Sequence, residues 1–141
     1  MAIKIAGTTV VDDSRNLVNI GTLNSKTLFE KQVVLNQYGD LELFTGTDRW
    51  YAPTSLTITN ITGRLYTPSV NDIVTFRVNK TQGNGSTTST NLSFTANTIK
   101  TSQSVSINMT TDDYITVDIT ALGDEGDTGA NLNVIFTYKE T

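Results

Sequence analysis

The sequence predicts an all-β protein, in which an extended N-terminal segment precedes an antiparallel β-sandwich of jelly-roll type. Thr, Asn, Ser and Gly dominate the polar residues, and these favour strands and turns. In several short stretches apolar and polar residues alternate, as in a strand with one buried face. Turn residues separate these stretches at the short spacing of a sandwich, and no stretch alternates a strand with a long helical pattern.

The first twenty residues predict short extended pieces joined by turns. Two pieces are expected within residues 3–11 around Gly7, and a third over residues 17–20. About twenty residues with so few apolar side chains cannot offset roughly 1–2 kcal/mol of backbone entropy per residue. We therefore expect this segment to need another surface, and we favour that of a partner molecule.

Residues 24–36 are compatible with a short helix or with a strand. Phe29 and Val33 lie four apart, as on one helix face, whereas the run Gln32–Leu35 suits a strand equally well. We favour strand or irregular structure, because a helix of about ten residues is marginal by itself. Turns are predicted at residues 38–40 and 46–48, with a strand over residues 41–45 between them. The N-terminal segment is accordingly assigned to residues 1–48 and the sandwich to residues 49–141.

From residue 49 the alternation becomes regular and predicts about seven to eight short strands. The polar stretch Thr81–Thr90 is predicted to be a mobile loop at one end of the sandwich, and Leu65–Tyr66 to begin a short extended piece. The sets expected to face the core are Leu56 and Ile58; Val74, Phe76 and Val78; Leu92, Phe94 and Ala96; Val105, Ile107 and Met109; Ile115, Val117 and Ile119; and Leu132, Val134, Phe136 and Tyr138.

The composition excludes several classes of function. A formal net charge of −4, without a Lys/Arg cluster, argues against binding a nucleic-acid backbone. The chain has no cysteine and no histidine, which excludes disulfides, thiolate or imidazole metal sites, and a Ser-His-Asp triad. No apolar run approaches the roughly 20 residues of a membrane helix, and Met1–Ile5 lacks the apolar core of a signal peptide. We expect a soluble chain made in a cytoplasm, with no membrane insertion and no cofactor.

The acidic residues do not predict an active site. Carboxylates in the loop 124–127 suit a hard cation such as Ca²⁺, but their spacing differs from the twelve-residue calcium loop, so a solvated loop without metal is favoured. The pairs Asp12–Asp13 and Asp112–Asp113 are sequence neighbours, which point to opposite faces of a strand. Two acids brought together only by folding would still serve a glycoside hydrolase. We predict that the chain is not an enzyme.

Aromatic and loop residues predict a contact surface for a receptor. Aromatic faces stack on sugar rings, so Trp50, Tyr51 and Tyr66 are candidate receptor-binding residues, with packing at the entry of the sandwich as the alternative. Asn84 and Ser86 are further candidates, because binding residues commonly lie on loops held by a rigid sandwich.

Two segments resemble bacteriophage tail-fibre and related virion proteins. Residues 3–20, with the sequence IKIAGTTVVDDSRNLVNI, are similar to the tail-facing N-terminal stretch of many phage fibres. Asp113–Thr120 and Gly129–Tyr138 are similar to a small β-sandwich domain of phage fibres, although Asp112 stands where that pattern usually has glycine. The resemblance implies a homotrimer. It assigns virion attachment and oligomerisation to Ile3, Ile5, Val10, Val11, Arg15, Leu17 and Ile20.

Three functions are compatible with these observations. The favoured one is a short trimeric tail fibre of the virion, attached through residues 1–48 to the tail or baseplate and presenting residues 49–141 to a host cell-surface glycan. The second is a structural component without a receptor, such as a tail or baseplate adaptor or a capsid decoration protein. The third is a small glycan-processing enzyme that uses carboxylates.

Overall fold

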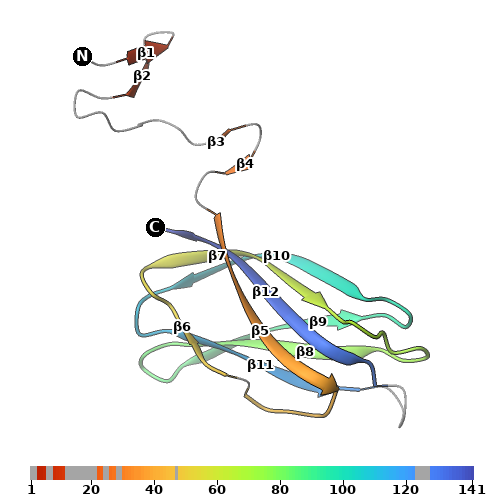
Figure 1. The fold of residues 1–141 in the computed structure, drawn as a ribbon. Coiled ribbons are helices and arrows are strands. Elements are labelled where there is room, and N and C mark those ends of the chain that lie inside the picture. Colours follow the sequence, from red (N-terminus) through yellow and green to blue (C-terminus); the bar gives the residue numbers. More distant parts are fainter. Residues whose placement is uncertain are drawn as a thin grey trace. The chain divides into compact units, whose positions relative to one another are not determined.

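All regular elements in the described part of the chain are β-strands (Figure 1). This computed structural model describes residues 3–5, 8–11, 22–23, 26–27, 30–46, 48–122 and 128–141. The chain divides into two units, Met1–Glu30 and Lys31–Thr141. No helix long and apolar enough to cross a bilayer occurs in the described residues.

In the described residues of the first unit, four short strands form two antiparallel pairs. They are β1 (Ile3–Ile5), β2 (Thr8–Val11), β3 (Thr22–Leu23) and β4 (Lys26–Thr27). β1 pairs antiparallel with β2, and β3 with β4. The two extended pieces expected within residues 3–11 are therefore present. Arg15, Leu17 and Ile20, together with the expected piece over residues 17–20, lie outside the described residues.

The second unit is a sandwich of two four-stranded sheets, in the orders β10-β7-β12-β5 and β6-β11-β8-β9 (Figure 1). Its strands are β5 (Glu30–Asp40), β6 (Trp50–Tyr51), β7 (Leu56–Arg64), β8 (Val74–Thr81), β9 (Thr87–Phe94), β10 (Lys100–Met109), β11 (Tyr114–Ala121) and β12 (Ala130–Glu140). Six of the seven connections cross from one sheet to the other, and only β8–β9 stays within a sheet. This is the topology of an eight-stranded jelly roll. The predicted fold class is confirmed.

The core lies between the two sheets and contains the apolar sets that the alternation predicts. Along β12 every second residue from Ala130 to Tyr138 is buried, and the intervening residues, including Ile135, are partly exposed. Three phenylalanines, Phe76, Phe94 and Phe136, are the largest fully buried side chains, and each is at most 1% exposed. Of the predicted core residues, only Ala96, Val105 and Ile107 are partly exposed rather than fully buried.

The sandwich begins earlier in the chain than the sequence predicts. β5 lies beside β12, where Lys31 contacts Glu140 at 2.6 Å and the Leu41 amide donates to the Gly129 carbonyl at 3.0 Å. Leu41 itself is only 2% exposed. The division at residue 48 is therefore too late, because residues 31–46 supply an edge strand and a core side chain. The preference for a strand over a helix holds for the described part of residues 24–36.

Three local predictions are wrong, two of them at and just after the end of β5. Residues 38–40 continue β5 instead of turning, and residues 41–45 form no strand beyond a single bridge between Phe44 and Ile119. The apolar residues in this stretch do not mark a strand. Leu41 is buried in the core, whereas Leu43 is 67% exposed. The predicted loop Thr81–Thr90 is also too long. β9 already begins at Thr87, since its Thr and Ser side chains suit a strand that pairs with β8.

Candidate functional site

The outer face of sheet β6-β11-β8-β9 carries a polar hollow of about 600 Å³. The strands place its residues there by alternation: while Phe76 and Val78 of β8 enter the core, Arg77 and Asn79 point outward. The segment before β6 forms one wall. The lining residues are Thr45, Gly46, Arg49, Arg77, Asn79, Thr81, Thr87, Ser89, Tyr114, Thr116 and Asp118.

Asp118 is the centre of a hydrogen-bond network in this hollow. Although it lies on the outer face, it is only 2% exposed. Its Oδ2 accepts bonds from Arg77 Nη2 at 2.6 Å, Arg77 Nε at 3.1 Å and Asn79 Nδ2 at 2.8 Å, and its Oδ1 accepts the Gly46 amide at 2.8 Å. Asn79 Oδ1 in turn accepts from Ser89 Oγ at 2.7 Å. The network fixes the wall segment, β8 and β9 against one another.

The electrostatics of Asp118 follow from these contacts. Burial by itself raises the pKa of a carboxyl group, but the bonds from Arg77, Asn79 and the Gly46 amide outweigh it and hold the pKa of Asp118 below its ordinary value. Asp118 is therefore ionised at neutral pH and its oxygens are occupied. It serves as a structural anchor, and it is poorly placed to transfer a proton to or from a ligand.

An aromatic and arginine cluster lies at one end of the hollow. The Arg49 guanidinium lies 4.8 Å from the centre of the Tyr114 ring, and the Tyr51 ring lies 5.3 Å from the same ring. A hydrogen bond with Tyr51 raises the pKa of Arg49. Tyr51 is 52% exposed, so its ring is held by Tyr114 while much of its surface faces solvent.

The neighbouring Trp50 has a different role. It points to the opposite side of β6 and packs on Tyr138 with ring centres 5.4 Å apart, against the core. The sequence allows two roles for this pair, packing at the entry of the sandwich and contact with a receptor. Trp50 has the packing role, and Tyr51 is available for contact. The reason is the opposite orientation of adjacent strand residues.

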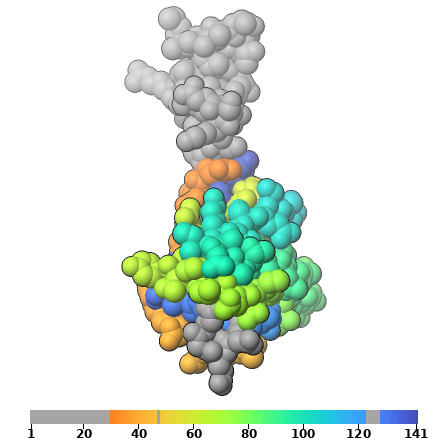
Figure 2. Space-filling view, turned by 90° about the vertical axis from the view of Figure 1, so that its right-hand side faces the viewer, coloured from red at the N-terminus to blue at the C-terminus, as the bar shows by residue number. Residues whose placement is uncertain are grey.

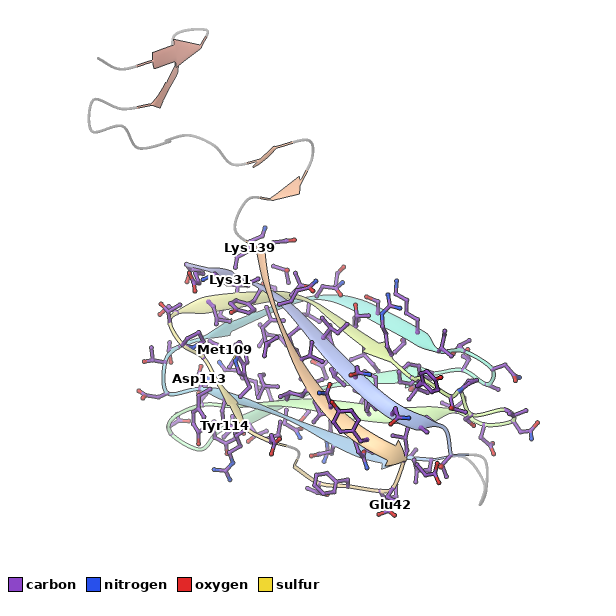
Figure 3. All side chains as sticks on the ribbon, viewed as in Figure 1. Lys31, Glu42, Met109, Asp113, Tyr114 and Lys139 are labelled. Atoms are coloured by element: carbon purple, nitrogen blue, oxygen red, sulfur yellow. The ribbon has the colours of Figure 1, made fainter. Side chains whose placement is uncertain are left out.

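A second hollow, of about 520 Å³, adjoins the first and shares Thr81 and Tyr114 with it. Its other wall is the β8–β9 loop, residues 82–86, in which the Asn84 side chain accepts the Ser86 amide at 2.9 Å. Asp113 holds this loop to the rest of the sandwich (Figure 3). Its carboxylate accepts the Gly83 amide at 3.2 Å and the Thr110 amide at 3.0 Å, and it forms an ion pair with Lys80 at 3.1 Å.

Of the five predicted receptor-binding residues, Tyr66 lies apart from the others. Its amide donates to the Ala130 carbonyl, so it belongs to the end of the sandwich where β12 begins, and it is 83% exposed. Figure 2 shows this end, with the β7–β8 and β9–β10 loops side by side. Tyr51, Asn84 and Ser86 instead lie toward the opposite end. The structure therefore does not bring the predicted set together into one surface.

Arg49, Arg77 and Tyr114 are not among the site residues that the sequence predicts. For Arg77 and Tyr114 a signal was present, because the predicted alternation already placed both on outward faces. What it did not provide was the antiparallel pairing of β6 with β11, which sets Tyr51 opposite Tyr114.

No cluster of three or more acidic side chains suited to a metal ion occurs in the residues that the structure describes. The acidic loop with Asp124, Glu125 and Asp127 lies outside these residues. It is the stretch that the sequence analysis considers as a possible cation site. In the pair Asp112–Asp113, Asp113 is buried and Asp112 is exposed, although the two residues lie in the turn before β11 and not in the strand that the sequence predicts.

No protein-family model matches the chain, and no curated protein sequence matches it. Among solved structures, the chain is similar to the globular domain of zebrafish complement 1qA protein, with 9% sequence identity and a TM-score of 0.46 over 79% of this chain and 96% of that one. It is also similar to a chain of the infectious bursal disease virus Gx strain, with 12% identity and a TM-score of 0.37 over 79% of this chain and 32% of that one.

Proposed function

We propose that this chain is a phage virion fibre protein with a saccharide-binding head. In this proposal the sandwich binds a glycan on the host surface, and the first unit attaches the protein to the tail or baseplate. The resemblance of residues 3–20 and of the two C-terminal strands to phage fibres supports the virion assignment. The polar hollow on the outer face of sheet β6-β11-β8-β9 supports the binding role.

The single observation that carries the binding role is the combination of an exposed aromatic ring with preorganised polar groups. Tyr51 offers an exposed ring surface in the adjoining hollow of about 520 Å³ and packs on Tyr114. The Tyr114 ring also lines the hollow of about 600 Å³, together with hydroxyls, an amide, two guanidinium groups and the bonded Asp118 carboxylate. Sugar rings need an apolar face to stack on and donors and acceptors for their hydroxyls. Because the Asp118 oxygens are already bonded, we propose binding without catalysis.

A glycan array tests the binding role. With the full chain as probe, we expect binding to a restricted set of glycans, and replacing Tyr51 with alanine should weaken it by roughly tenfold, since one stacking contact is lost. The matched control is Tyr66→Ala, which removes an even more exposed tyrosine at the other end and should leave binding unchanged. Both variants should keep the thermal transition of the wild type. Equal binding by Tyr51→Ala and the wild type would refute the assignment of this face.

We further propose that three chains assemble through the first unit. The unit has short strands and few apolar side chains, so it gains little from folding in isolation. Light scattering on the purified full chain should give the mass of three 15.3 kDa chains. A single chain of 15.3 kDa would contradict the trimer, and it would favour an adaptor or decoration protein if the array also remains negative.

A further inference from the structure

We infer that the hollow on sheet β6-β11-β8-β9 selects saccharides that carry an anionic group, namely a carboxylate, sulfate or phosphate, with Arg49 as the residue that binds it. This inference rests on the proposed saccharide-binding function and specifies its ligand. The preference for an anion follows from the charged residues that line the hollow.

The hollow carries an excess positive charge in an acidic protein. Its charged lining residues are Arg49, Arg77 and Asp118, whereas the whole chain has a formal net charge of −4. Asp118 is buried and pairs with Arg77 at 2.6 Å, so these two charges largely cancel each other. Arg49 remains as the uncompensated charge of the lining.

The neighbouring carboxylates belong to other hollows. Asp48 precedes Arg49 in the sequence but lines a smaller hollow with Asn36, Gln37 and Phe44. Asp112 lines the adjoining hollow beside Tyr51. The two hollows meet at Tyr114. An anion is therefore favoured in the hollow that Arg49 and Arg77 line, and not in the one that Asp112 lines.

Arg49 is positioned to bind an oxyanion. Its guanidinium carbon lies 4.8 Å from the centre of the Tyr114 ring, and a hydrogen bond with Tyr51 holds the group as well. A guanidinium has five N–H donors, so donors remain for a ligand. A planar fork of donors matches a carboxylate or phosphate, so the group is oriented before a ligand arrives. The hydroxyls of Thr81, Thr87 and Ser89 on the same hollow then suit the neutral hydroxyls of the sugar.

The test is a glycan array with four classes of matched oligosaccharide: neutral, carboxylated, sulfated and phosphorylated, probed with the full chain. We expect binding only among the three anionic classes, and the strongest class identifies the anion. Arg49→Gln should weaken binding by roughly tenfold and reduce its dependence on salt, because a charge-assisted hydrogen bond and one charge are lost. The matched control is Arg64→Gln, an exposed arginine on the other sheet, which should bind as the wild type does.

The possible failures are distinguishable. Binding of the neutral oligosaccharides as tight as that of their anionic counterparts would overturn this inference and leave the saccharide-binding function standing. Unchanged binding by Arg49→Gln would likewise overturn the role of Arg49. Failure to bind all four classes would overturn both the inference and the proposed function.

Discussion

Replacing Asp118 with alanine is expected to lower the free energy of unfolding by about 3 kcal/mol, which is typical of removing one partner from a buried charge pair. The substitution leaves Asn79 Nδ2 and the Gly46 amide without their acceptor, and it leaves Arg77 without its counter-charge. The loss stays near the lower end of the usual range because the Arg77 side chain is 41% exposed and regains contact with water. Chemical denaturation at pH 7 measures the change.

The matched control is Asp112→Ala. Asp112 is exposed, so its replacement should change the stability by no more than about 0.5 kcal/mol. Acid provides a second control. The pKa values of Asp113 and Asp118 are lowered in the folded state, so the stability they contribute is present above their ordinary pKa of 3.8 and is lost as the pH falls below it. Asp118→Ala should lose less stability than the wild type between pH 5 and about pH 2. An equally steep loss in both would contradict the role of Asp118.

Replacing Gly63 with alanine should destabilise the sandwich by about 2–3 kcal/mol, the upper part of the usual range for inserting a methyl group into a packed core. Gly63 lies in β7, and a Cβ atom there would be 2.7 Å from both Phe76 Cε1 and Phe94 Cζ. These two rings pack against each other with centres 5.6 Å apart, and both are at most 1% exposed, so neither can move aside without loss. Thermal and chemical denaturation measure the effect.

A double substitution identifies the cause. Phe94→Leu alone removes buried volume and should also destabilise, but it makes room for the added methyl group of Gly63→Ala. The double variant should therefore be more stable than the sum of the two single losses predicts. If the losses of stability simply add, the requirement for Gly63 comes from its backbone conformation and not from the space beside the two rings.

The sequence predicts the sandwich well because its signal is local. Strands such as β11 and β12 alternate strictly, and each apolar residue of that alternation is buried. The sequence favours a strand at the start of β5 but gives neither its full length nor its place in the sandwich, because it is an edge strand: Val33 and Leu35 are only partly buried and its other residues are polar or exposed, so the alternation is weak. The boundary of the sandwich depends on that strand, and the misplaced boundary follows from the same cause.

The candidate site could be predicted only in part, because it depends on contacts between residues far apart in the chain. The aromatic side chain of Tyr51 is enough to predict a contact role, but its partner Tyr114 lies sixty-three positions later and meets it only through the pairing of β6 with β11. Likewise Asp118 follows a pattern that predicts an exposed acid. It is buried because the segment around Gly46 covers that face of the sheet.

The central claim is that the outer face of sheet β6-β11-β8-β9 is the surface that binds a glycan. An NMR titration of the ¹⁵N-labelled full chain with the strongest ligand from the array tests it without any substitution. Amide shift changes are predicted to concentrate at Arg49, Tyr51, Thr81, Thr87 and Thr116. Changes concentrated instead in the β7–β8 and β9–β10 loops around Tyr66 would contradict the account.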